Sequence, residues 1–201
     1  MSEPAPVFPP VPAPEDFDQR VILHDVSWEQ FETILAIRGD RAGVRMAYLE
    51  GELELMSPSR GHEKLKKLMA RLLEAWADER GIDVEGFGSE TLRNAPRERG
   101  AEPDECYCVG EEKERPDLAI EVVWTSGGLD KLEIYRELGV REVWVWQRGT
   151  LGLYALRGGR YEPIERSLVL PDFDVALFVS FLGESSQTRA VRAFRAALRS
   201  I

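Results

Sequence analysis

The chain has 201 residues, of which 43% are hydrophobic and 31% are charged, as in an ordinary globular protein with room for one domain and a sizeable core. Its formal net charge of −10 excludes a protein that holds nucleic acid through an overall positive charge. A membrane protein is not expected either, because the sequence has no run approaching the roughly 20 apolar residues of a membrane-spanning helix.

The first 19 residues, MSEPAPVFPPVPAPEDFDQ, are rich in proline and carry six of the chain's 12 prolines. This composition predicts a disordered or polyproline-like tail over residues 1–19. The segment lacks the basic start and the apolar core of a signal peptide, so we expect a cytoplasmic protein. The remaining residues, 20–201, are expected to form a single domain.

The first half of that domain is predicted as a helix, a β-hairpin and a longer helix. Ser27 and Gln30 form the pattern of a capping box, which predicts a helix from about residue 28. The stretch VRMAYLEGELELM is typical of a hairpin that turns at Glu50-Gly51. The second helix is expected to start at Ser57-Pro58-Ser59 and to end at Gly81.

The second half is predicted to alternate strands and helices. After an arginine- and glycine-rich loop, TLRNAPRERG, we expect the strands DECYCV and DLAIEVVW. A helix, DKLEIYRELG, follows and ends at Gly139, and EVWVW is typical of a largely buried strand. LGLYAL and RYEPIE suggest further strands, and the chain closes with a helix in RAVRAFRAALRSI. This order predicts one α/β domain with a mixed sheet.

Residues 115–123 read RPDLAIEVV, with one acidic residue inside an otherwise apolar strand. The stretch resembles the start of a metal-dependent nuclease signature, Pro-Asp, a spacer and Glu-x-Lys, except that Val123 stands at the lysine position. Glu121 shares one face of the strand with Val123, and an unpaired carboxylate there is costly to desolvate. Glu121 is therefore either a metal ligand or a glutamate that is partly solvated or paired with an arginine.

Two aspartates compete as the partner of Glu121. Asp117 lies four residues away on the same strand, about 13 Å at ~3.3 Å per residue. That separation is too long for both side chains to bind one ion whose oxygen ligands lie at roughly 2.1 Å. Asp104, in EPDECYCV, begins the preceding strand, and antiparallel pairing of the two strands would bring its carboxylate to Glu121. Asp104 is therefore the predicted partner.

Two further charged residues are candidates for the site. Lys131 is the only charged member of an apolar helix stripe that continues through Ile134, Tyr135 and Leu138. Its stem either covers apolar surface while the ammonium reaches solvent, or the ammonium replaces the lysine missing at position 123. Glu63, in the first turn of the second helix, either complements the helix dipole or contacts a metal-bound water.

Four segments together resemble the Uma2 family, classed within the PD-(D/E)XK nuclease superfamily: LMSPSRGHEKLKKLM, GSETLR, EPDECYCV and RPDLAIEVVWTSGGLDKLEIYRELGVREVWVW. The resemblance covers about residues 20–185. It implies the restriction-endonuclease-like α/β fold, a mixed central β-sheet flanked by helices, here with an N-terminal β-hairpin extension. It also implies hydrolysis of DNA phosphodiester bonds by an endonuclease that uses Mg²⁺ or Mn²⁺.

The resemblance also assigns roles to the candidate residues. Asp104 and Glu121 match the family's two metal-binding acids, and Glu63 matches the acid of its first core helix. Lys131 matches a lysine on the following helix that can take the place of the one absent at Val123. Nucleases of this fold often pair to cut two strands, so a homodimer is expected.

A second hypothesis is a catalytically silent dimeric interaction module that retains the nuclease fold. The acidic balance of the chain favours it, since a nuclease usually presents a basic groove. Local phosphate contacts would have to come from two arginine-rich segments, which contain Arg93, Arg97 and Arg99 in the first and Arg189, Arg192, Arg195 and Arg199 in the second. A stripe of charge is more often a solvated face.

Overall fold

A computed structural model describes residues 17–39, 41, 43–125 and 127–200. Within these ranges the helices are α1 (Trp28–Arg38), α2 (Arg60–Arg80), α3 (Lys131–Leu138), α4 (Val175–Ser180) and α5 (Gln187–Leu198), with a 3₁₀ turn, η1 (Ala95–Arg97). The strands are β1 (Gln19–Leu23), β2 (Arg45–Leu49), β3 (Glu52–Ser57), β4 (Val84–Gly86), β5 (Leu92–Asn94), β6 (Arg99–Ala101), β7 (Glu105–Val109), β8 (Leu118–Val123), β9 (Glu142–Gln147), β10 (Thr150–Arg157) and β11 (Arg160–Ile164). The chain is a mixed α/β protein.

Helix ends follow the capping signals of the sequence. Ser27 and Gln30 make the reciprocal bonds of a capping box at the start of α1. The Ser59 hydroxyl caps α2, and Gly81 ends that helix in the left-handed conformation, which glycine adopts without steric cost. Gly139 ends α3 in the same way. These helix predictions are confirmed.

The strands form two sheets rather than the single mixed sheet that the sequence predicted. The six-stranded sheet has the order β11-β10-β9-β8-β7-β4, in which β8 and β9 are parallel and the other neighbours antiparallel. The predicted hairpin, β2 and β3, is confirmed, but it forms the middle of a separate five-stranded sheet, β1-β3-β2-β6-β5. The hairpin is therefore part of a second sheet and not an extension of the central sheet.

The second sheet exists because a segment predicted as a loop pairs with the hairpin. β5 lies within TLRNAPRERG and β6 extends one residue beyond it; each is only three residues long, and together they enclose η1. β6 pairs antiparallel with β2, with Ala101 opposite Ala47. Strands this short carry little local signal, because their stability comes from the neighbouring strand and from side-chain packing.

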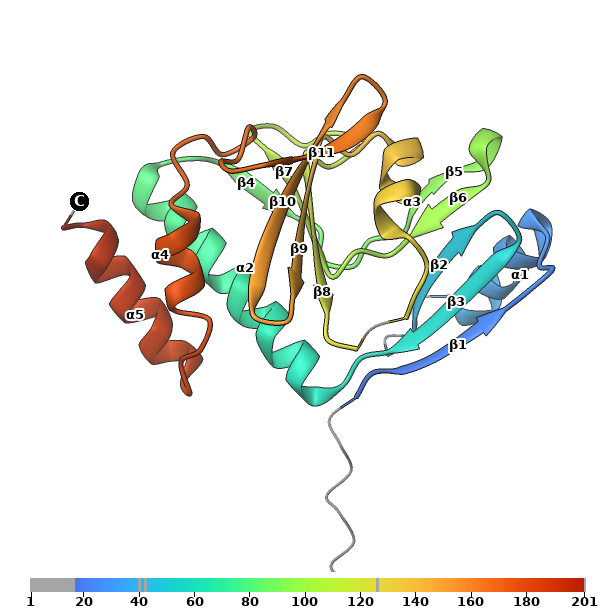
Figure 1. Ribbon diagram of the computed structural model, residues 1–201, viewed down its shortest axis with the longest axis horizontal. Coiled ribbons are helices and arrows are strands. Elements are labelled where there is room, and N and C mark those ends of the chain that lie inside the picture. The colour runs from blue at the N-terminus through green and yellow to red at the C-terminus, as the bar shows by residue number, and fades with distance from the viewer. Residues whose placement is uncertain (1–16, 40, 42, 126, 201) are drawn as a thin grey trace, which may run out of the picture.

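Helices cover both faces of the six-stranded sheet (Figure 1). On one face lies α2, followed by α4 and α5, and the shared core includes Trp76, Ile120, Trp144 and Phe194. On the other face lies α3, packed between the two sheets. Alternation along β8 therefore directs Ile120 and Val122 to α2 and the opposite face, which bears Glu121, to the space beside α3.

The described residues begin within the segment predicted as the tail. Residues 1–16 of the predicted tail lie outside the described residues. Gln19, the last residue of that tail, already belongs to β1, and Asp18 before it is buried. In the described ranges, α1 to α5 include no helix with the length and apolar character needed to cross a membrane.

Candidate functional site

Asp104 and Glu121 come from neighbouring strands of the six-stranded sheet. β7 and β8 are antiparallel and pair Glu105 with Ile120, so Asp104, just before β7, stands opposite Glu121. One Asp104 oxygen, Oδ2, accepts a hydrogen bond from the Val122 backbone N–H at 2.6 Å. Both acids are buried, with 1% and 6% of their surface exposed. Strand pairing thus places the two residues opposite one another on neighbouring strands.

Lys131 reaches Glu121 from α3. Its ammonium nitrogen lies 3.9 Å from Glu121 Oε1, and its side chain is mostly covered. One helical turn further, the Tyr135 hydroxyl donates a hydrogen bond to the same oxygen. Burial first, and the nearby Glu121 charge second, raise the pKa of Tyr135 well above its usual value, so the phenol stays a protonated donor. A cation and a phenol therefore converge on Glu121.

The position of α3 depends on the second sheet. Glu54, a buried residue of β3, accepts a hydrogen bond from the Leu129 backbone N–H at 3.0 Å. The Asp130 side chain then caps the first turn of α3, whose first residue is Lys131. The hairpin sheet consequently helps to set where the ammonium of Lys131 lies.

A buried histidine connects Asp104 to the start of the fold. His62, in the first turn of α2, is fully buried, and its Nε2 lies 2.9 Å from Asp104 Oδ1. Its other ring nitrogen, Nδ1, lies 3.0 Å from Asp18 Oδ2. Only a doubly protonated imidazole can donate to both carboxylates at once. The sequence showed His62 only as the backward continuation of an apolar stripe, and these contacts were not predicted.

Asp18 ties the segment before β1 to α2. Its Oδ1 accepts a hydrogen bond from the Ser59 backbone N–H at 2.8 Å. Burial by itself raises the pKa of Asp18, but the hydrogen bonds from His62 and Ser59 outweigh burial and hold that pKa below its usual value. A residue that the sequence assigned to the tail is thus an ionised member of the site.

Arg45 of β2 brings a cation to Asp104. The same oxygen that meets His62 forms an ion pair with Arg45 Nη1. Arg45 Nη2 bonds Glu63 Oε1 at 2.6 Å, so Glu63 connects with Asp104 through the guanidinium. Lys66 binds the other Glu63 oxygen at 2.8 Å. Burial raises the pKa of Glu63, but Lys66 and then Arg45 lower it more, so the pKa lies below its usual value.

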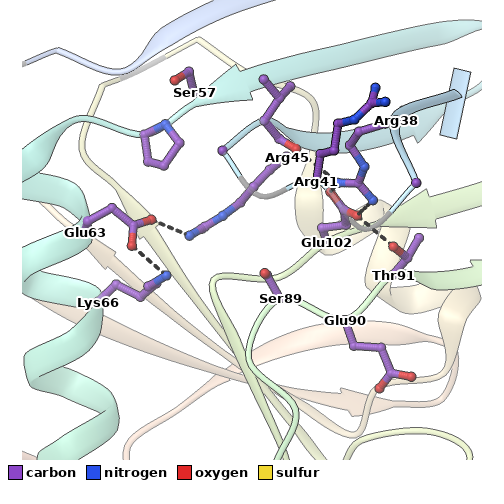
Figure 2. Close-up of a pocket in the computed structure, with 14 residues that line it drawn as sticks. Arg38, Arg41, Arg45, Ser57, Glu63, Lys66, Ser89, Glu90, Thr91 and Glu102 are labelled. Carbon is purple, nitrogen blue, oxygen red and sulfur yellow. Dashed lines mark hydrogen bonds and ion pairs between the residues drawn. The ribbon is translucent and has the colours of Figure 1, made fainter.

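A cavity of about 770 Å³ opens beside this network. Figure 2 shows Glu63 and Lys66 of α2 on one side, with Arg45 directed toward Glu63. On the other side, Arg38 binds Glu102. The cavity lining is therefore a mixture of both charges rather than a basic groove.

The donor set around Asp104, as arranged, does not fit a divalent metal. Mg²⁺ requires near-octahedral oxygen ligands at about 2.0–2.1 Å. Asp104 already forms an ion pair with Arg45, lies 2.9 Å from His62 Nε2 and accepts a hydrogen bond from the Val122 N–H. Over residues 17–39, 41, 43–125 and 127–200, no group of three or more His, Cys, Asp or Glu side chains could hold a metal ion.

Asp117, the competing aspartate, has structural partners of its own. Its carboxylate binds Lys113, Arg141 at 3.0 Å and the Val109 backbone N–H at 2.9 Å. These bonds fix the turn between β7 and β8. Burial raises the pKa of Asp117, but the bond from Lys113 and the other two bonds lower it more, so the pKa lies below its usual value.

Asp117→Asn is expected to weaken the dependence of stability on pH in acid. A depressed carboxyl pKa contributes stability that is complete above the unfolded value, near 3.9, and is lost as pH falls through the lower folded value. Urea unfolding between about pH 5 and pH 3 should therefore show a smaller loss of unfolding free energy in the variant than in wild type. Asp172→Asn, at an exposed aspartate, is the control. Equal pH dependence in wild type and Asp117→Asn would contradict this assignment.

The two arginine-rich segments are largely neutralised by acids. Their ion pairs are Arg93 with Glu32, Arg97 with Glu137, Arg99 with Glu50, Arg195 with Asp78 and Glu79, and Arg199 with Glu79. An arginine that already binds a carboxylate must leave it to bind a phosphate. Neither segment is therefore a ready-made phosphate surface.

Comparison with known proteins identifies the family. Among curated proteins, none matches the chain. Among solved structures it is similar to one titled "a putative nuclease belonging to DUF820 from Anabaena variabilis ATCC 29413". Sequence identity is 15%, the match covers 86% of this chain and 99% of that one, and the TM-score is 0.49. The model of the family described as "Uma2: Putative restriction endonuclease" matches residues 28–181, most of the chain. The chain therefore belongs to the Uma2 family.

Proposed function

We propose that the chain is a cytoplasmic endonuclease of the restriction-endonuclease-like fold that hydrolyses phosphodiester bonds of DNA. The observation that carries the proposal is the Lys131 ammonium 3.9 Å from Glu121, on the strand beside Asp104. Local helix physics gives no reason for a lysine at this position, because a cation in the first helical turn opposes the dipole. Membership of a family described as restriction endonucleases supports the same reading.

The residues around Glu121 are suited to hydrolysis. The Glu121 carboxylate would accept a proton from a water whose oxygen attacks phosphorus, while the bond from phosphorus to the leaving oxygen breaks and that oxygen takes a proton from solvent water. The Lys131 ammonium would stabilise the negative charge that develops on the phosphoryl oxygens. Tyr135 holds the Glu121 carboxylate in place, and Glu63 supports Asp104 through Arg45. The predicted Mg²⁺ or Mn²⁺ would need Arg45 to leave Asp104.

The second candidate is a catalytically silent interaction module. Its supporting observation is that Asp104, the acid a nuclease would use for a metal, already forms an ion pair with Arg45 and contacts His62. The overall charge of −10 and the paired arginine segments agree with this alternative. Both candidates are proposed to be homodimers, and light scattering at micromolar concentration would contradict the dimer if it gave the mass of one chain.

A cleavage assay separates the two candidates. The full chain is incubated with single-stranded, linear duplex and supercoiled DNA, in Mg²⁺, in Mn²⁺ and in a chelator. The nuclease proposal expects products with wild type and none with Glu121→Gln, which removes the proton acceptor and keeps the side-chain shape. If wild type and Glu121→Gln give equal products, Glu121 does not accept the proton and the site assignment is wrong. If wild type cuts nothing in any condition, the silent module is supported.

A further inference from the structure

Arg45 forms an ion-pair bridge between two carboxylates, and its role extends beyond the proposed hydrolysis. Its side chain is 9% exposed, and its guanidinium joins two carboxylates, Asp104 through Nη1 and Glu63 through Nη2. Arginine is the residue best suited to such a bridge, because its planar fork carries a permanent charge and several donors in fixed directions. Arg45 is thus a built-in counter-ion of the buried Asp104.

A metal ion on Asp104 would need the place that Arg45 occupies. Arg45 Nη1 and His62 Nε2 both contact Asp104 Oδ1, and the Val122 N–H donates a hydrogen bond to Oδ2. A carboxylate offers about four lone-pair sites, so little of Asp104 remains for further ligands. A divalent cation beside a guanidinium is also repelled by it, and the repulsion is strong because buried charges are poorly screened.

The cavity gives the Arg45 guanidinium room to move away from Asp104. Arg45 lines the cavity of about 770 Å³ together with its second partner, Glu63. The guanidinium can therefore leave Asp104 without becoming an isolated buried charge, because Glu63 is 43% exposed and stays within reach. Loss of the Asp104 contact then costs less than burial of an unpaired arginine would.

We propose that Arg45 excludes divalent metal from Asp104, so that the Arg45–Asp104 ion pair and a metal on Asp104 are mutually exclusive. Arg45 sets the affinity of the chain for divalent metal by occupying the Asp104 carboxylate. The identity of the metal, Mg²⁺ or Mn²⁺, rests on the proposed function, but the competition at Asp104 does not depend on catalysis.

The test measures Mn²⁺ binding to the full chain without DNA, by calorimetry and by the loss of the free Mn²⁺ resonance signal. Arg45→Gln is expected to bind Mn²⁺ at least roughly 10-fold more tightly than wild type, about 1.4 kcal/mol. Arg41→Gln removes a charge from the lining of the same cavity without breaking a carboxylate pair, so its affinity should equal that of wild type. The gain should disappear in Arg45→Gln combined with Asp104→Asn.

Two results would overturn the proposal. One is equal Mn²⁺ binding by wild type and Arg45→Gln, whether tight, weak or undetected. The other is an equal gain in Arg41→Gln, which would show that the effect is only general charge. If Arg45→Gln does not fold, Arg45→Met is used; it keeps an apolar stem of similar length but loses the charge, and it must also bind Mn²⁺ more tightly than wild type. A chain that gains metal binding but never cuts DNA would refute the proposed nuclease and leave this inference intact.

Discussion

Lys131→Ala is expected to lower the rate of DNA cleavage by roughly 10²–10³-fold, the usual effect of removing one group that stabilises charge in a transition state. The Lys131 ammonium is the nearest cation of α3 to Glu121, at 3.9 Å. The melting temperature should change little, because Lys131 is partly solvated and the apolar members of its stripe stay buried. A large kinetic loss without a loss of stability would mark a functional lysine.

Single-turnover cleavage of an end-labelled duplex, at saturating protein, measures this effect on the chemical step. Lys64→Ala, at an exposed lysine of α2, controls for the loss of one surface charge and should cut like wild type. Val123→Lys in the Lys131→Ala background should restore part of the rate, because strand alternation aims position 123 at the face of Glu121. If wild type cuts and Lys131→Ala cuts equally fast, the lysine only covers apolar surface.

His62→Ala is expected to destabilise the fold by about 3–5 kcal/mol, the usual cost of removing one partner from a buried ion pair. His62 is fully buried between Asp18 and Asp104, at 3.0 and 2.9 Å. The substitution leaves a cavity and two buried carboxylates that have lost a shared donor. Of the two carboxylates, Asp18 should lose the most stabilisation, because the hydrogen bond from His62 is the strongest influence lowering its pKa.

Urea unfolding at neutral pH measures this loss, and the chain supplies its own control. The other of its two histidines, His24, is 68% exposed and bonds Glu52 at 3.0 Å on the surface. His24→Ala should cost no more than about 1 kcal/mol, as for other exposed ion pairs. Equal losses for the two variants would show that the buried His62 contacts do not stabilise the fold.

The sequence by itself determined the elements whose signals are local. The capping box at Ser27, the hairpin turn at Glu50-Gly51 and the glycine that ends α3 all act within a few residues. The same short-range regularity was enough to place Lys131 on the apolar stripe of α3. It also led to the choice of Asp104 over Asp117, because strand rise and strand pairing are fixed by backbone geometry.

Only the tertiary structure decided which charges neutralise one another. Arg45, His62 and Asp18 come from β2, α2 and the segment before β1, and no sequence spacing relates them to Asp104. The second sheet brings them together. It includes the three-residue strands β6, which pairs with β2, and β5, which pairs with β6, and strands this short are stable only when paired. Burial makes an unpaired carboxylate costly, but many of the chain's arginines could satisfy that need. The choice among them is made by long-range packing, which local sequence patterns do not encode.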